Sequence, residues 1–325
     1  MPDKLVRIGR ASRPGQDGPA RPVMLAIAGD SAAGKTTLTR GLVETLGPER
    51  CTSICVDDYH RYDRVERKDK PFTALHPEGN YVNIMEQHLQ LLAAGQPILK
   101  PVYDHHTGML VRPELIEPRE YVIIEGLLPL YSKMSRACFD VSVYLDLPED
   151  IRRDWKVRRD TRDRGYSAEA VLAELERREP ESQAFIRPQR QYADIVVRFA
   201  PIEGRNDPPG TPLSVSLMLR PTIAHPNVAA ILDGEDGKAL HVKLVRDQDG
   251  KPVDALHIHG YAPREASRKV ETEIWGSLGE VGPLPEGIGK VDGKRTEPVA
   301  ITQLLLLYHI IANAKAQESE REANG

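Results

Sequence analysis

Short apolar runs separated by polar stretches recur through the first two thirds of the chain. Buried strands are expected where these runs occur, at residues 23–28, 52–56, 121–126, 141–146 and 195–199. The stretches between them read as helices at residues 37–43, 83–94, 151–165 and 168–178. Strands that alternate with helices are typical of a doubly wound α/β fold with a mostly parallel sheet. The pattern predicts this fold class, with residues 195–199 as the last strand of the sheet.

The pattern changes after about Gly204. A Pro- and Gly-rich loop at residues 206–212 precedes several short β-like runs, among them 213–219, 240–245 and 253–258, with turns at Asp233-Gly234 and Asp249-Gly250. A helix at residues 300–311 is apolar nearly all round, so we expect it to be buried against the main body or a second subunit. Residues 1–21 are polar and predict a frayed leader with at most one short edge strand at residues 5–8.

Composition narrows the class of protein. The chain has 325 residues, 40% of them hydrophobic and 28% charged, which is typical of an ordinary globular protein. Its formal net charge of −4 gives no general positive field that would attract nucleic acid. We see no apolar run near the ~20 residues of a membrane span and no hydrophobic signal core, and expect a cytoplasmic protein. The three cysteines make no disulfide framework and show no zinc spacing with histidine.

A phosphate-binding motif follows the first apolar run. The sequence GDSAAGKT fits G-x-x-x-x-G-K-[ST] and stands between a predicted strand and a predicted helix. This context disfavours the alternative that the segment is a glycine-containing turn without a ligand. Its backbone N–H groups, the Lys35 ammonium and the Thr36 hydroxyl suit phosphates and Mg²⁺. We therefore expect a nucleotide to bind the following residues: Gly29, Asp30, Ser31, Ala32, Ala33, Gly34, Lys35, Thr36 and Thr37.

Acidic residues end two of the other predicted strands. Asp57 and Asp58 follow the second strand, and Glu125 ends the strand at residues 121–126. Because the carboxyl ends of parallel strands meet at one edge of the sheet, we expect these carboxylates near the nucleotide phosphates. Glu125, with Thr36, is the expected ligand of Mg²⁺, directly or through water.

Two segments are dense in cations. Residues 61–70 are either a solvated charged loop or a loop that binds a second phosphorylated molecule. Their position directly after a strand-end aspartate favours the binding loop. The helix at residues 151–165 carries seven Lys and Arg side chains and is expected to form a lid over ATP. His105 and His106, on adjacent strand positions that point to opposite faces, are expected to make ordinary polar contacts rather than share a metal ion.

Several spaced motifs together resemble one family. GDSAAGKT, VDDYHRYDRVERKDK, TALHPEGN, KPVYDHHTG, VIIEGLLPLY, WKVRRDTRDRG and RPQRQYADIVV occur in the order found in phosphoribulokinases of the plant and cyanobacterial branch, within the larger phosphoribulokinase and uridine kinase group of P-loop kinases. The resemblance covers residues 23–200 closely and the C-terminal part more weakly. It implies a P-loop kinase domain at residues 22–204 and a mixed α/β extension at residues 205–325 packed on the kinase core.

The resemblance also implies a reaction and residue roles. ATP and ribulose 5-phosphate would give ribulose 1,5-bisphosphate and ADP, with Mg²⁺, in a Calvin-cycle enzyme that is a homodimer. Asp57 would be the catalytic base, and Lys35, Lys156 and Arg159 would neutralise the transferred phosphoryl group, with Arg159 and Arg164 on the nucleotide. The sugar phosphate would be bound by Asp57, His60, Arg64, Arg67, Lys68, Tyr103 and His105.

The chain departs from the plant-type pattern at several positions. Ala33 stands where redox-switched relatives have a cysteine, their C-terminal cysteine pair is absent, and Cys55 alone matches. His76 replaces an acid and Leu128 a histidine, so the pentose pocket is open to difference. A uridine or other nucleoside kinase, or a kinase for another pentose phosphate, stays an alternative. An ATP-binding regulator without catalysis is disfavoured because Lys35, Asp57 and Glu125 are all present.

Overall fold

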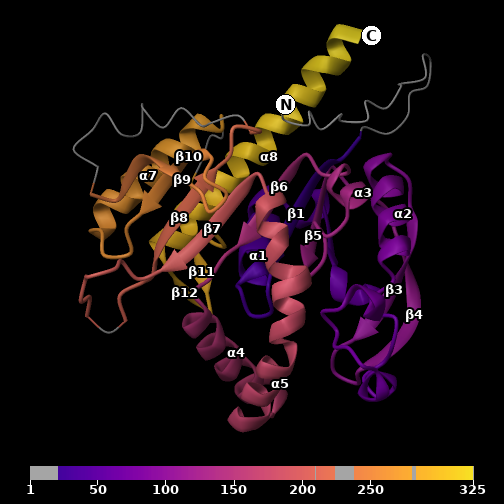
Figure 1. Ribbon diagram of the computed structural model, residues 1–325. Coiled ribbons are helices and arrows are strands. Elements are labelled where there is room, and N and C mark those ends of the chain that lie inside the picture. The colour runs from indigo at the N-terminus through magenta and orange to yellow at the C-terminus, as the bar shows by residue number, and fades with distance from the viewer. Residues whose placement is uncertain (1–20, 209, 224–237, 280–282, 325) are drawn as a thin grey trace.

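A computed structural model describes residues 21–208, 210–223, 238–279 and 283–324 of the chain (Figure 1). The expected leader at residues 1–20 with its edge strand, and the turn at Asp233-Gly234, lie outside the described residues. The main sheet has eight strands in the order β2-β5-β1-β6-β7-β8-β10-β9. Their bounds are β1 Val23–Gly29, β2 Cys51–Cys55, β5 Tyr121–Gly126, β6 Val141–Leu145, β7 Ile195–Ala200, β8 Ser214–Leu219, β9 Leu240–Arg246 and β10 Pro252–Ile258.

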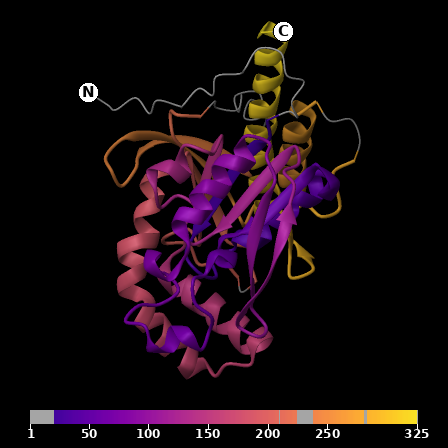
Figure 2. The ribbon, with the colours of Figure 1, turned by 90° about the vertical axis from the view of Figure 1, so that its right-hand side faces the viewer.

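Helices and a separate hairpin surround this sheet. The helices are α1 Lys35–Leu46, α2 Val82–Ala93, α3 Lys133–Arg136, α4 Glu149–Arg164, α5 Ala168–Glu181, α7 Arg264–Ser277 and α8 Glu297–Asn324. The strands β3 Ile98–Asp104 and β4 Met109–Ile116 pair as an antiparallel hairpin, and β11 Lys290–Val291 pairs with β12 Lys294–Arg295. In Figures 1 and 2, α4 and α5 lie at the end of the molecule opposite the C-terminal part of α8.

The half of the sheet built from β2, β5, β1, β6 and β7 is parallel. β1 lies between β5 and β6, so the loop after β1 emerges where the strand order reverses, the usual ligand position in an open α/β sheet. The predicted doubly wound, mostly parallel fold is confirmed.

The sheet does not end at β7, and the prediction that residues 195–199 form its last strand was wrong. β8 pairs antiparallel with β7, and β10 and β9 continue the sheet in the same sense. Without β8, one edge of β7 would expose unpaired backbone groups. The C-terminal extension therefore continues the sheet of the first half of the chain.

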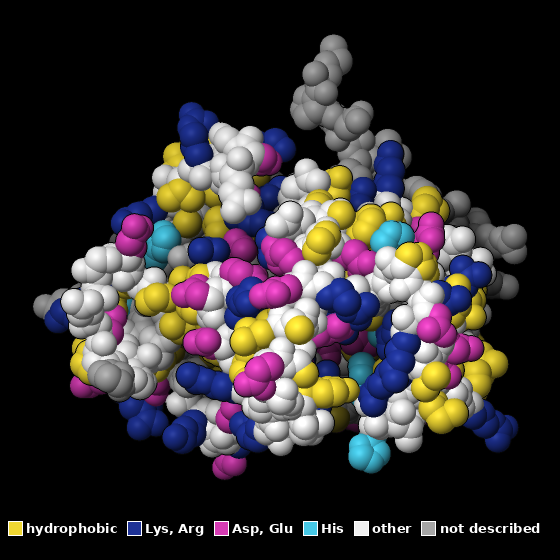
Figure 3. All heavy atoms as spheres, turned by 60° about the horizontal axis from the view of Figure 1, so that its bottom comes forward, with side chains coloured by type: hydrophobic (Ala, Val, Ile, Leu, Met, Phe, Trp, Pro, Cys, Tyr) yellow, Lys and Arg dark blue, Asp and Glu magenta, His cyan; other side chains and the backbone are white. Residues whose placement is uncertain are grey.

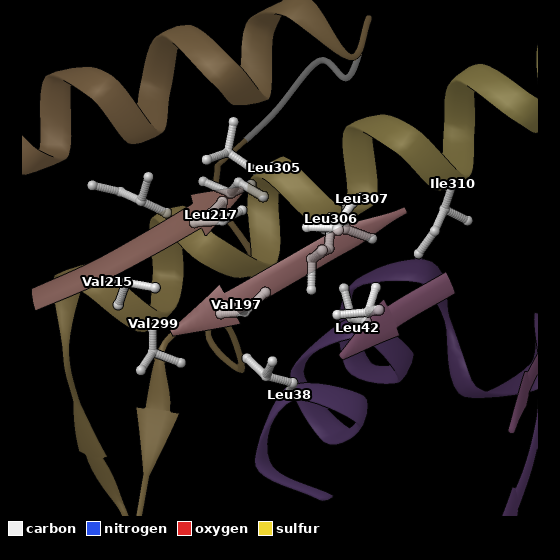
Figure 4. Packing of buried hydrophobic residues seen from close by; sticks show 14 of the residues in the cluster. Leu38, Leu42, Val197, Val215, Leu217, Val299, Leu305, Leu306, Leu307 and Ile310 are labelled. Carbon is white, nitrogen blue, oxygen red and sulfur yellow. The ribbon is translucent and has the colours of Figure 1, made fainter. Parts of the chain in front are cut away.

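Alternation along β1 sends its side chains into hydrophobic clusters on opposite faces of the sheet. Val23, Leu25 and Ile27 face one core, which α1, α7 and α8 cover, whereas Met24 belongs to the core that α2 covers. Successive side chains of a strand point to opposite faces, so a strand buried on both sides reads as an unbroken apolar run. Figure 4 shows the first core, with leucines of α8 against Val197, Val215 and Leu217 of the sheet and Leu42 of α1.

Helix α8 is the central element of that first core. Residues 300–307 are all fully buried or nearly so, as the sequence predicts for a helix apolar all round. The stretch Glu297–Ser319 is long and apolar enough to cross a membrane by length and composition, contrary to the expectation that no run approaches that length, and 61% of the 18-residue window that meets this test is buried inside the molecule. Packing against the sheet accounts for its apolar surface.

Candidate active site

The loop between β1 and α1 has the backbone geometry of a phosphate cradle. Ala32 and Gly34 adopt positive φ angles of 64° and 91°, which turn successive N–H groups toward a common point. Positive φ costs free energy at Ala32, which has a side chain, so the surrounding contacts must hold it there. The Lys35 ammonium donates to the carbonyls of Gly29 and Asp30 at 3.0 and 2.9 Å.

Oxygen atoms suited to a magnesium ion meet beside this loop. Thr36 Oγ1 donates to Glu125 Oε1 at 3.2 Å, and Thr39 Oγ1 lies 3.5 Å from Glu125 Oε2. Burial raises the pKa of Glu125, although Lys35 and these hydroxyls oppose the shift. A buried carboxylate together with the Thr36 and Thr39 hydroxyls is an all-oxygen donor set, which is what Mg²⁺ prefers, so these residues fit the ion.

The two aspartates after β2 have different surroundings. Asp58 accepts a hydrogen bond from the Tyr103 backbone N–H at 3.1 Å and forms an ion pair with the buried Lys100 ammonium, so it ties the β3–β4 hairpin to the sheet. Asp57 lines the cavity described below, and its carboxylate lies 3.8 Å from His105 Nε2. Burial would raise the pKa of Asp57, but His60 and Lys35 outweigh it and lower that pKa. Asp57 is therefore an ionised carboxylate open to a ligand.

The cationic loop at residues 61–70 folds against the β3–β4 hairpin. Arg64 donates to the His105 carbonyl at 2.6 Å, and Arg67 donates to the Tyr103 hydroxyl at 2.7 Å. These contacts give the loop a defined position beside Asp57, which a freely solvated charged loop would lack. Arg64, Arg67 and Lys68 of this loop line the same cavity as the aspartate.

His105 and His106 lie in the turn between β3 and β4 rather than on adjacent strand positions. The argument that they point to opposite faces of a strand therefore does not apply. No group of three or more His, Cys, Asp or Glu side chains in the described part of the chain is arranged to hold a metal ion.

Helix α4 brings further cations over the phosphate loop. Asp160 binds Lys156 Nζ and Arg159 Nε at 2.9 Å each, and Arg164 Nε lies 3.6 Å from the same carboxylate. Lys156 Nζ and Arg159 Nη2 are 3.5 and 3.4 Å from Ser31 Oγ. Burial, with help from Arg178, lowers the pKa of Lys156 to about 8. One buried carboxylate thus gathers the cations beside the loop.

These groups share one cavity of about 600 Å³. Figure 3 brings this end of the molecule forward and shows Lys, Arg and His side chains around a hollow. Most of the predicted site residues line the cavity, namely Ser31, Ala32, Lys35, Thr36, Asp57, His60, Arg64, Arg67, Lys68, Tyr103, His105, Glu125, Lys156, Arg159 and Arg164. Gly29, Asp30, Ala33, Gly34 and Thr37 do not line it, and the Asp30 side chain is turned toward Arg152 and Ser182 instead.

Sequence reasoning missed several residues of the cavity wall. Asp160, Tyr166, Glu174, Arg177 and Arg178, from α4 and α5 and the loop between them, also line it. Glu174 binds Arg177 at 2.8 Å and also pairs with Arg178, a spacing that in a sequence reads as an ordinary solvated helix face. The arginine-rich stretch before Asp160 was the only local signal for that aspartate.

The parallel sheet, the phosphate loop after β1 and the acid at the end of β5 define a P-loop fold of the kinase type. A family model described as the Phosphoribulokinase / Uridine kinase family matches residues 24–204, and the chain belongs to this family.

Relatives within the family include phosphoribulokinases and uridine kinases. The chain is 45% identical over 181 residues to the phosphoribulokinase of Synechocystis sp., which covers 56% of this chain and 54% of that one. It is 36% identical over 255 residues to the chloroplastic phosphoribulokinase of Triticum aestivum, covering 73% of this chain and 57% of that one. A uridine kinase of Deinococcus deserti is 32% identical over 200 residues, covering 59% and 93% of the two chains. The aligned part thus spans about half the length of the phosphoribulokinases.

A solved structure shares the fold. The phosphoribulokinase from Rhodobacter spheroides has a TM-score of 0.56 with 18% identity, over 79% of this chain and 97% of that one. The match extends beyond the length of the family model, which agrees with the continuous sheet described above.

Proposed function

We propose that this protein transfers the γ-phosphoryl group of ATP to ribulose 5-phosphate, giving ribulose 1,5-bisphosphate and ADP. The observation that carries the proposal is the position of Asp57, an ionised carboxylate in one cavity between the phosphate loop and the cationic loop at residues 61–70. A sugar hydroxyl held by that loop would lie beside both the carboxylate and the terminal phosphate of ATP. The phosphoribulokinase relatives support the same substrate.

In the proposed reaction, Asp57 accepts the proton of the sugar hydroxyl as its oxygen attacks the γ-phosphorus of ATP. The bond from that phosphorus to the bridging oxygen breaks, and ADP leaves. Lys35, Lys156 and Arg159 offset the negative charge on the transferring group. Thr36 and Glu125 would hold Mg²⁺, which supplies further charge neutralisation at the phosphates when it is bound.

The phosphate of the acceptor is assigned to the cationic side of the cavity. Arg64 and Arg67 line this side of the cavity while they also bind the hairpin. His60 is held there by a 2.7 Å contact between its Nδ1 and Asn80 Oδ1. Within the described residues, no hydrogen bond or ion pair involves the Lys68 ammonium, so its charge is available to a phosphate dianion. This cationic wall favours a sugar phosphate over an uncharged nucleoside.

The departures from the plant-type pattern at His76 and Leu128 lie outside the cavity wall. His76 packs on the Phe72 and Phe185 rings, at centroid distances of 5.2 and 4.6 Å, and Leu128 is buried in the core beside α2. Neither side chain lines the cavity. They therefore give no direct reason to expect a different acceptor.

The proposed function also implies cofactors, an assembly, a location and domain bounds for this protein. ATP and Mg²⁺ are the proposed cofactors, a homodimer is the proposed assembly, and the cytoplasm is the proposed location. The proposed kinase domain at residues 22–204 is supported by the family match at residues 24–204, with the C-terminal extension at residues 205–325 as a continuation of its sheet.

Coupled ADP release against ribulose 5-phosphate, other sugar phosphates and uridine tests this function. We expect ribulose 5-phosphate to have the highest kcat/KM, and a preference for uridine would overturn the proposal in favour of a nucleoside kinase. Lys68→Ala should raise KM for the sugar phosphate about tenfold or more, because a hydrogen bond to a charged group contributes ~1.5–3 kcal/mol. Lys70→Ala is the matched control, since the Lys70 ammonium lies 4.4 Å from the Tyr62 ring centroid and outside the cavity wall.

A further inference from the structure

The C-terminal end of α5 holds two loops of the active site from one point. After Pro180 the helix passes into a π-helical turn over Ser182–Ile186. π-Helical turns are rare in proteins, and those that occur are often found at functional sites. Glu181 and Ser182, adjacent at this junction, bind two different loops although neither residue lines the cavity.

Ser182 holds the phosphate loop through Asp30. The Ser182 hydroxyl donates to Asp30 Oδ2, while Asp30 Oδ1 accepts from the Ser31 N–H at 2.6 Å and pairs with Arg152 Nη1 at 3.4 Å. Ser182, Asp30 and Arg152 are 1%, 6% and 5% exposed, so water does not compete strongly for these bonds. The contact fixes Ser31, whose hydroxyl faces Lys156 and Arg159.

Glu181 holds the loop that leads to the acceptor side. Its carboxylate accepts from the Thr73 N–H at 2.8 Å and from the Thr73 hydroxyl, and Thr73 is 3% exposed. From there Asn80 Nδ2 donates to the Ala74 carbonyl at 3.0 Å, and Asn80 Oδ1 contacts His60 Nδ1 at 2.7 Å. A continuous set of contacts thus joins Glu181 to His60 in the cavity wall.

We propose that Ser182 and Glu181 are positioning residues for phosphoryl transfer, Ser182 for the ATP loop and Glu181 for the acceptor loop. Successive residues of a helix point about 100° apart, which lets one backbone position reach two neighbours. Because the two residues share a peptide bond, a shift of one loop displaces the anchor of the other. Occupancy of the ATP site is therefore coupled to the geometry of the acceptor site. This inference rests on the proposed kinase function.

Two variants separate the two roles. Ser182→Ala should raise the Kd for ATP about 3- to 10-fold and leave KM for the acceptor within about twofold, because it removes one hydrogen bond to a carboxylate. Glu181→Gln should do the reverse, raising KM for the acceptor about 3- to 10-fold. Gln183→Ala is the matched control on the same turn, since its side-chain amide donates to Glu179 on α5, at 2.8 Å, rather than to either loop.

The double variant tests the coupling. If the junction transmits displacement, the loss of kcat/KM in Ser182→Ala/Glu181→Gln will differ from the product of the two single losses. Equal rises of both constants in both single variants, with a parallel fall of the melting temperature, would overturn the proposal in favour of general structural support. Unchanged constants in both variants would overturn it as well.

The readouts also separate this inference from the proposed function. Calorimetric titration with ATP needs no acceptor, so it decides the role of Ser182 whatever the sugar specificity is. If the substrate panel selects another phosphorylated acceptor, the Glu181→Gln comparison is made with that acceptor. Failure of ribulose 5-phosphate alone would then overturn the proposed substrate and leave the positioning roles to stand or fall on their own measurements.

Discussion

Asp57 and Asp58 are adjacent carboxylates whose neighbours give them different roles. Asp58 compensates the buried Lys100 ammonium and anchors the hairpin, whereas Asp57 has histidine and lysine neighbours that keep it ionised in the cavity. A proton acceptor must be both charged and accessible to substrate. Only Asp57 of this pair meets both conditions.

Asp57→Asn should lower kcat by at least ~10²-fold, because general-base assistance is typically worth ~10²–10⁴ in rate. Binding of ATP and the melting temperature should stay close to those of the unmodified protein. Asp58→Asn is expected to behave in the opposite way, lowering the melting temperature because Lys100, with its side chain 7% exposed, loses its nearer charge partner and keeps the exposed Glu114 carboxylate at 3.9 Å. Steady-state kinetics and thermal unfolding of both variants measure this contrast, and near-normal kcat in Asp57→Asn would remove it from the mechanism.

Lys156 predicts a pH dependence of ATP use. Its pKa of about 8 means that the free enzyme loses this charge as pH rises through that value. We therefore expect kcat/KM for ATP, which reports ionisations of the free enzyme, to fall above about pH 8. Lys156→Arg should flatten this decline because arginine stays protonated. An identical alkaline limb in both proteins would assign the ionisation to another group.

At the scale of elements, α1 and α8 approach each other closely at Gly41. A Cβ added there would lie 2.0 Å from Gln303 Nε2 of α8. Gln303 is fully buried and cannot easily move, since its amide donates to the Thr37 carbonyl at 3.2 Å and accepts from the Gly289 N–H at 2.7 Å. The close contact joins the C-terminal helix to the helix that follows the phosphate loop.

Gly41→Ala should therefore destabilise the protein by about 1–3 kcal/mol, the usual cost of overpacking a core. The sign is opposite to that of an ordinary Gly→Ala change inside a helix, which gains ~0.5–1 kcal/mol. Gly276→Ala in α7 is the control, because a Cβ there meets nothing within 4 Å. Chemical denaturation of the two variants checks the prediction, and equal stabilities would mean that α8 yields at this contact.

Strand β2 bears on redox control. Cys51 and Cys55 are its first and last residues, so at ~3.3 Å per residue they lie too far apart for the ~7 Å Cα separation that a disulfide allows. Ala33, in the phosphate loop, supplies no sulfur. Burial also raises the pKa of Cys51 to about 11 and the pKa of Cys55 well above its usual value, which disfavours the reactive thiolates.

Activity should therefore be the same after mild oxidation as after dithiol reduction. Parallel assays of the two preparations, each with a count of free thiols, test this. Reversible loss of activity together with the loss of two thiols would contradict both the distance argument and the role of Ala33.

At the scale of the whole molecule, the sheet carries a histidine cluster far along the chain from the phosphate loop. The rings of His241 and His257 stack on paired strands, and His241 Nδ1 lies 2.7 Å from His259 Nε2. One of those two nitrogens must carry the proton and the other accept it, so a second proton breaks the bond. Burial, then His241 and His257, and also Arg205 and Lys243, lower the pKa of His259 to about 4.

Stability should consequently fall in mild acid. The pKa of His259 is lower in the folded protein than its ordinary value of 6.5, so between about pH 6.5 and pH 4 the unfolded chain binds more protons. The stabilisation is complete above that window and is lost as pH falls through it. Melting temperatures at pH 7 and pH 5 should differ less in His259→Gln than in the unmodified protein. His106→Gln, in the exposed β3–β4 turn, should leave the difference unchanged.

The sequence by itself determined the parts of this protein that depend on neighbouring residues. Apolar runs predicted the parallel strands, GDSAAGKT predicted the phosphate loop, and strand-end acids predicted Asp57 and Glu125 at one edge of the sheet. These features are local because a strand, a loop and the side chain that follows it share one stretch of backbone.

Only the tertiary structure decided the contacts between distant segments. It gave Asp57 and Asp58 different roles, because the hairpin binds Asp58 and leaves Asp57 in the cavity wall. It also brought Arg178 into the cavity and continued the sheet past β7. It also joined Ser182 to Asp30, which are 152 positions apart. No local pattern encodes such pairs, because the partner is chosen by how helices and strands pack and by which buried polar groups need a hydrogen bond.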